Sequence, residues 1–221
     1  MLDVVNRRFF LRSAGVAAAT GAFVMSACTD KEVDPAGQVQ VVDLGTGDIG
    51  ILNYAYALEQ LEAAFYTQVM MTPYTGMTAA ETSILTDIRD HEIVHRDFFK
   101  AALGAAAIPG LSVNFSAIDF KSRESVLGTA KVFEDTGVAA YNGAGKLIKD
   151  GGYLLLAGKI VSVEARHAAI IRDLLTPNTI AFAGDDVIDS NGLEAAKSPS
   201  VILSAVAPFI TTKISGNNLP K

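Results

Sequence analysis

Apolar residues recur at intervals of three and four from about residue 48 onwards, which is the period of an amphipathic helix. This pattern predicts four long helices, over residues 48–71, 78–103, 122–149 and 153–175. The second helix begins at the capping box Thr78–Glu81. Residues 104–121, which contain Pro109 and Gly110, show little periodicity. A connection of this length predicts a crossover between the second and third helices rather than a tight hairpin.

Polar side chains interrupt the apolar stripe of every predicted helix. They are Glu59 in the first helix, Glu92 and His95 in the second, Glu134 in the third, and Glu164 and His167 in the fourth. An isolated buried carboxylate is strongly unfavourable, and four in one core would repel each other and raise their own pKa values. We therefore expect positive charge among them.

The spacing of these residues suits a metal site. A Glu and a His three residues apart share one helix face and can grip a single ion. One such pair arises easily by chance, but two pairs here use two of the three histidines in the chain. Four carboxylates with two neutral imidazoles would be balanced by two divalent cations, and this ligand chemistry suits iron or manganese. The alternative is a structural bundle that has lost its metal and kept the ligand types.

The order Glu, Glu-x-x-His, Glu, Glu-x-x-His, with a long central connection, resembles the ferritin-like superfamily over residues 48–175. The stretches 132–135 and 163–169 are similar to exported bacterial ferritin-like domain proteins of the desiccation-related type. The resemblance implies an all-α fold, a four-helix bundle with a crossover between its second and third helices. It also implies that Glu92 and Glu164 bridge two metal ions, with Glu59 and Glu134 terminal and one ion on each of His95 and His167.

Two tyrosines favour Glu59 over Glu62 as the ligand from the first helix. Tyr66 follows Glu59 by seven residues and Tyr141 follows Glu134 by seven, so each lies on the face of its glutamate. The resemblance implies that each tyrosine hydrogen-bonds a ligand carboxylate of the opposite helix. Plain core packing is the alternative for both tyrosines, and Glu62 stays an alternative ligand.

Three further residues lie next to predicted ligands in the sequence. His91 precedes His95 by four residues, and we expect it beside the ligands rather than among them. Asp135 and Arg166 each adjoin a predicted ligand, and either could support that ligand or lie at the surface.

The N-terminus has the pattern of an export signal. Residues 1–27 carry Arg7 and Arg8 before Phe-Phe-Leu and a short apolar stretch, which resembles a twin-arginine signal, although an ordinary secretory signal is the alternative. Cys28 ends a lipoprotein-like cleavage box and is the candidate lipidation site; otherwise it is a free thiol. Residues 28–47 read as a linker. Removal of residues 1–27 changes the formal net charge from −6 to −8.

Composition excludes several classes of protein. A net charge of −6 argues against nucleic-acid binding, and a single cysteine excludes an internal disulfide, a zinc finger and a protein-ligated iron–sulfur cluster. Residues 176–221 form a predicted C-terminal extension, mostly loop, with a short helix over residues 201–210 that docks on the bundle.

The predicted function is that of a di-metal oxidoreductase in the periplasm or cell envelope. Ferroxidase-like consumption of dioxygen or hydrogen peroxide, in protection against stress, follows from the ligand set and the resemblance. The alternative is a non-enzymatic, metal-stabilised protein that protects the envelope during desiccation or stress. We expect a monomer or small homo-oligomer, because a lipid anchor and a long extension fit a closed storage shell poorly.

Overall fold

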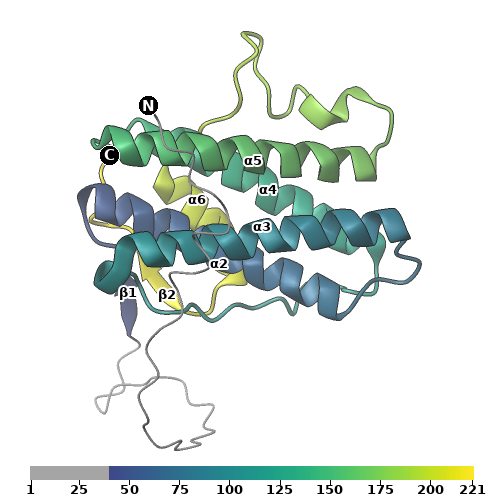
Figure 1. Cartoon of the computed structure of the whole chain (residues 1–221), viewed down its shortest axis with the longest axis horizontal. Coiled ribbons are helices and arrows are strands. Elements are labelled where there is room, and N and C mark those ends of the chain that lie inside the picture. The colour runs from purple at the N-terminus through teal and green to yellow at the C-terminus, as the bar shows by residue number, and fades with distance from the viewer. Residues whose placement is uncertain (1–39) are drawn as a thin grey trace, which may run out of the picture. The chain divides into compact units, whose positions relative to one another are not determined.

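The computed structural model describes residues 40–221, and its largest elements are four helices that lie side by side (Figure 1). They are α2 (Gly47–Met71), α3 (Ala79–Leu103), α4 (Arg123–Gly145) and α5 (Gly151–Leu175). The short 3-10 turns are η1 (Gly104–Ala106), η2 (Ile180–Ala183) and η3 (Ala207–Phe209). The predicted export signal, Cys28 and most of the linker lie outside the described residues.

The helix starts follow the capping signals in the sequence. The Thr78 side chain accepts a hydrogen bond from the Glu81 amide, and the Glu81 carboxylate accepts one from the Thr78 amide, so the predicted capping box is confirmed. Asp150 caps α5 by accepting hydrogen bonds from the amides of Gly152 and Tyr153. This cap explains why α5 begins two residues earlier than predicted.

The predicted end of the third helix at residue 149 is wrong, because α4 ends at Gly145. The chain turns there, with amides of residues 147 and 148 bonded to carbonyls only three residues earlier. Asp48 at the start of α2 then accepts the amides of Lys149 and Asp150, at 2.9 and 2.8 Å. These bonds hold the α4–α5 turn against the first turn of α2.

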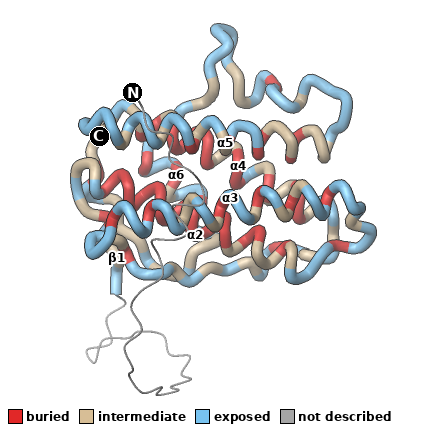
Figure 2. Tube along the Cα trace, in the orientation of Figure 1, coloured by how far each residue is buried: buried red, intermediate tan, exposed pale blue. Residues whose placement is uncertain are grey.

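The bundle consists of two antiparallel hairpins, α2 with α3 and α4 with α5, joined by the predicted long crossover. Two polar side chains of α2 hold the crossover along the helix. Asn53 donates to the Ala106 carbonyl at 2.9 Å and accepts the Ile108 amide at 2.9 Å, and Gln60 accepts the Leu111 amide at 2.8 Å. Covered in this way, α2 is buried on nearly every side, as Figure 2 shows.

The C-terminal extension packs on the bundle through α6 (Pro199–Val206), whose Ile202 and Val206 are buried. The helix therefore begins before residue 201 and ends before residue 210, because Pro199 starts it and η3 follows it. Sequence reasoning missed that β2 (Lys213–Ser215) pairs in parallel with β1 (Val41–Asp43). The extension thus fastens both ends of the described chain together.

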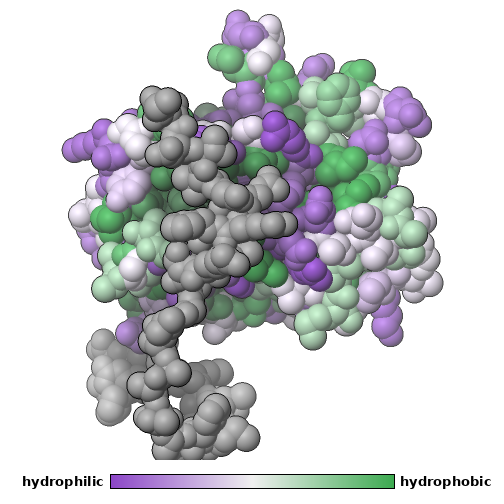
Figure 3. Space-filling view, in the orientation of Figure 1, coloured by the Kyte–Doolittle hydropathy of each residue, from purple (hydrophilic) through white to green (hydrophobic). Residues whose placement is uncertain are grey.

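The surface view in Figure 3 shows polar and apolar side chains intermixed on one face. Several large apolar side chains are exposed, among them Leu154 and Leu155 near the start of α5. Within residues 40–221, none of the helices combines the length and the apolar run that a bilayer crossing requires.

Candidate metal centre

The structure brings all six predicted ligand side chains together between the four helices. They are Glu59 on α2, Glu92 and His95 on α3, Glu134 on α4, and Glu164 and His167 on α5. The four carboxylates are at most 1% exposed, and the two imidazole side chains are 12% and 5% exposed. They meet because each occupies the inward stripe of its helix.

The ligand atoms form two overlapping groups, and in each group they lie within 4.8 Å of one another. In the first group, His95 Nδ1 lies 2.8 Å from Glu164 Oε1 and 3.5 Å from Glu59 Oε2. The fourth member is Glu92, whose Oε2 lies 3.9 Å from the same nitrogen. Three carboxylates and one imidazole can together hold a metal ion.

The second group mirrors the first around His167. His167 Nδ1 lies 2.8 Å from Glu92 Oε1 and 3.4 Å from Glu164 Oε2. Glu134 Oε2 completes this group at 3.5 Å from the nitrogen. Glu92 and Glu164 therefore belong to both groups, and each directs one oxygen to either histidine. This is the placement that two bridging carboxylates would need.

The side-chain atoms that could ligate a metal in this centre have no hydrogen-bond partners. Eight side-chain oxygens and nitrogens of the six residues are buried without one, including both oxygens of Glu92 and of Glu164 and Nδ1 of both histidines. The short imidazole–carboxylate contacts thus do not have hydrogen-bond geometry. Because buried polar atoms are almost always paired, a cation shared by these donors fits the arrangement, and its chemistry suits hard or borderline metals.

Two tyrosines cross the bundle to hold the terminal carboxylates. Tyr66 on α2 donates a hydrogen bond of 2.5 Å to Glu134 Oε1 on α4. Tyr141 on α4 donates to Glu59 Oε1 on α2. In each glutamate the other oxygen, Oε2, is left facing the centre. The tyrosines therefore orient the two carboxylates rather than adding ligands.

His91 lies beside the centre, next to His167. Its Nδ1 is 2.9 Å from Nε2 of His167, and the two rings are stacked with an interplanar angle of 10°. When Nδ1 of His167 binds a metal, Nε2 carries the ring proton and can donate it to His91. The position of His91 thus matches the expectation that it lies beside the ligands.

Glu62 belongs to neither ligand group of the described residues, although it is buried. Its carboxylate packs against Gly137 of α4, where an added Cβ would lie 3.2 Å from Glu62 Oε1. Burial, followed by the charges of four neighbouring glutamates, raises the pKa of Glu62 well above its usual value. Burial and like charge thus both disfavour the ionised form of Glu62.

Of the two charged neighbours, Arg166 is exposed and Asp135 is half-buried. Asp135 accepts two hydrogen bonds from Arg172, at 2.8 and 2.7 Å, and Arg172 also binds Asp186 through two bonds of 2.9 Å. Sequence reasoning missed this buried arginine. Arg172 thus joins the loop after α5 to Asp135 of α4.

The charges of the centre shift its pKa values strongly. Burial and the neighbouring carboxylate of Glu164 raise the pKa of Glu59, and burial raises the pKa values of Glu92 and Glu134. Burial would lower the pKa of His95, but Glu164 and Glu59 raise it to about 9. The centre therefore favours bound positive charge, whether protons or metal ions.

An all-α bundle with a long central crossover and a buried carboxylate–imidazole centre defines the ferritin-like class of proteins. A family model described as ferritin-like domain matches residues 47–177, and the chain belongs to that family. No curated protein matches the chain.

Proposed function

We propose that this protein is an exported di-metal carboxylate protein, with iron as its metal, that acts as a ferroxidase-like oxidoreductase. The observation that carries the proposal is the pair of buried ligand groups that share Glu92 and Glu164. Membership of the ferritin-like family supports the same reading. Manganese is the alternative metal, because the same ligand types accept it.

In the proposed site, Glu92 and Glu164 would be shared by two ions. Glu59 and His95 would help to hold one ion, and Glu134 and His167 would help to hold the other. When bound, a pair of ferrous ions supplies two electrons, which with two protons reduce dioxygen to hydrogen peroxide, or hydrogen peroxide to two water molecules. The hydroxyls of Tyr66 and Tyr141 keep the terminal carboxylates in position throughout. The surrounding apolar core excludes bulk water from the centre.

The proposed setting is the periplasm or cell envelope, in protection against stress. Residues 1–27 resemble a twin-arginine signal, and Cys28 follows a lipoprotein-like box that would anchor the protein to a membrane. An acidic chain, with a net charge of −6, would draw cations towards itself. A monomer or small homo-oligomer is proposed for the same anchored form.

The decisive experiment measures metal content and oxidation together. The exported protein, isolated from the envelope of its host, should hold about two metal atoms per chain, the number that the ligand set of such bundles accommodates. Ferrous loading should then give oxidation with dioxygen or hydrogen peroxide. Glu92→Gln should abolish both properties, because it removes the negative charge that both groups share and replaces one of the two oxygens with an amide nitrogen. Unchanged metal content and oxidation in this variant would refute the proposal.

A matched control is Glu124→Gln, the same chemical change in the exposed first turn of α4. It should retain both metal and oxidation, so that a loss in Glu92→Gln is assigned to the centre. Circular dichroism of each variant separates the loss of a ligand from unfolding.

A non-enzymatic role is the second candidate. The ligands come from all four helices, so bound metal would cross-link the bundle and stabilise the folded protein. Two metal atoms per chain, raised thermal stability and no turnover with either oxidant would favour this protective role over an oxidoreductase.

A further inference from the structure

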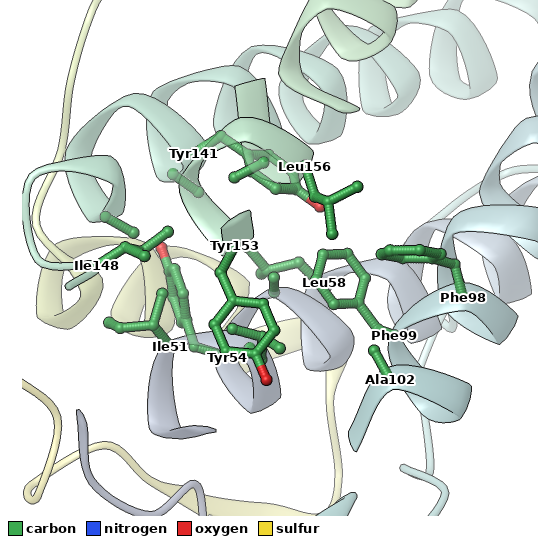
Figure 4. A pocket seen from close by; sticks show the side chains of 15 residues that line it. Ile51, Tyr54, Leu58, Phe98, Phe99, Ala102, Tyr141, Ile148, Tyr153 and Leu156 are labelled. Atoms are coloured by element: carbon green, nitrogen blue, oxygen red, sulfur yellow. The ribbon is translucent and has the colours of Figure 1, made fainter. Parts of the chain in front are cut away.

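A small apolar cavity lies between α2, α3, α4 and α5, at the end of the bundle where α5 begins. Its volume is about 30 Å³. Figure 4 shows Phe98 and Phe99 on one side of it and Ile51 and Ile148 on the other. Most of the lining side chains are aliphatic or aromatic, and Leu156 of α5 is among them.

The cavity shares its wall with the metal centre. Tyr141 lines the cavity, and its hydroxyl donates to Glu59 of the first ligand group. Leu58, another lining residue, directly precedes Glu59 in α2. Phe99 lies one helical turn after His95 in α3. A single layer of side chains therefore separates the cavity from the Glu59 and His95 half of the centre.

The size and lining of the cavity decide what it can hold. A site for one water needs at least roughly 10–15 Å³ and two to four polar partners. Thus about 30 Å³ is enough for a diatomic molecule. The hydroxyl of Tyr141 is already committed to Glu59, whereas the buried hydroxyl of Tyr54 has no partner and could bind one water. One free hydroxyl is fewer than the two to four partners that a buried water needs, so water and hydrogen peroxide would lose hydrogen bonds on entry, whereas an apolar gas would lose none.

We propose that this cavity is a binding site for dioxygen that supplies the Glu59 and His95 half of the metal centre. The inference rests on the proposed function, because the dioxygen would be consumed at the metal centre. It assigns dioxygen, rather than hydrogen peroxide, as the oxidant of that centre. Phe98 and Leu156, which are 37% and 36% exposed, belong to the part of the wall that reaches the surface. Gas would enter between these two side chains.

Xenon is the probe for the cavity, because dry apolar cavities bind it independently of any redox reaction. Crystals of the full chain pressurised with xenon should show it between Tyr141, Phe99 and Leu156. Ala157→Leu, at a half-buried lining position of α5, should fill the space and remove the xenon. The matched control Ala165→Leu, at an exposed position of the same helix, should keep it.

Oxidation rates supply the second readout. In iron-loaded Ala157→Leu, oxidation by dioxygen should slow roughly tenfold, which corresponds to about 1.4 kcal/mol in the barrier. Oxidation by hydrogen peroxide should keep the rate of Ala165→Leu.

The outcomes separate this inference from the proposed function. Ordered water in place of xenon in the wild-type cavity overturns the inference, even where iron is oxidised. Equal slowing with both oxidants in Ala157→Leu also overturns it. If xenon binds but neither oxidant reacts, the gas site is supported and the proposed oxidoreductase function is the part that fails.

Discussion

Tyr66 on α2 donates a hydrogen bond of 2.5 Å to Glu134 on α4, while Tyr141 on α4 donates to Glu59 on α2. Each of these two helices thus donates a tyrosine hydrogen bond to a glutamate of the other. Burial and the adjacent carboxylates raise the pKa values of both tyrosines well above their usual value, so both stay protonated donors at neutral pH. These paired bonds fix the two terminal carboxylates before any metal binds.

Tyr66→Phe should lower the free energy of unfolding and weaken metal binding. The substitution removes the donor to Glu134 and leaves Oε1 of a buried carboxylate unpaired. A hydrogen bond to a charged group contributes about 1.5–3 kcal/mol, and we expect a loss of this size. Denaturant unfolding measures it. Tyr153→Phe, at a half-buried position, is the control. An equal loss of unfolding free energy in both variants would contradict the role of Tyr66 in holding Glu134.

His91→Ala should weaken the metal at His167 more than the metal at His95. His91 Nδ1 is 2.9 Å from Nε2 of His167 and would fix the orientation of that ring. Loss of such a supporting partner costs roughly 10–100-fold in metal affinity. Chelator competition should therefore resolve one weakened and one unchanged site per chain. Two equally weakened sites, or none, would argue against this role for His91.

Glu62→Gln should leave metal binding intact, whereas Glu59→Gln should remove metal from the first group. Glu62 lies outside both ligand groups, and burial with the neighbouring glutamates raises its pKa, so a neutral amide of the same size suits its position. Glu59 contributes a charged oxygen, and the neutral amide of Gln would balance less of the charge of a bound ion. Metal atoms per chain, counted by elemental analysis, distinguish the two variants. Metal loss in Glu62→Gln would make Glu62 a ligand after all.

The helical period was enough to predict which six side chains meet at the centre. Each of them interrupts an apolar stripe, so a wrong register on any helix would have turned its polar residue outwards. The choice of Glu59 over Glu62 came from the seven-residue spacing to Tyr66, and the structure places only Glu59 in a ligand group. The spacing of residues within each helix was therefore enough to predict the four helices and their inward-facing side chains.

The helical period could not predict contacts between segments that are distant in the sequence. Arg172 joins Asp135 and Asp186, which lie 37 and 14 residues from it, and no periodicity links them. The pairing of residues 41–43 with 213–215 is equally non-local. The end of α4 was misjudged because Asp48, far away in the sequence, captures the amides of the following turn.

Acid should weaken the start of α3 through Glu81. Burial alone would raise the pKa of Glu81, but the Thr78 amide and the Arg123 guanidinium lower it to about 2. A lowered pKa stabilises the fold above the ordinary value of about 4.5, and this stabilisation is lost as pH falls towards 2. Glu81→Gln should cost roughly 1–3 kcal/mol at pH 7 and much less near pH 2. Urea unfolding of the wild type and the variant at the two pH values tests this prediction. A difference in unfolding free energy that does not change with pH would contradict it.

Two glycines of α4 should respond in opposite ways to alanine. A Cβ on Gly143 would lie 1.8 Å from the Lys197 carbonyl oxygen, where the C-terminal extension crosses α4, whereas one on Gly128 would meet nothing within 4 Å. Gly143→Ala should therefore destabilise the protein by at least roughly 1–3 kcal/mol, because the backbone of the extension must shift. Gly128→Ala should stabilise it by up to about 1 kcal/mol through helix propensity. Thermal unfolding of both variants, with hydrogen exchange at residues 197–206, shows whether the loss is confined to the extension. A stable Gly143→Ala with protected amides there would mean that the extension does not depend on this close approach.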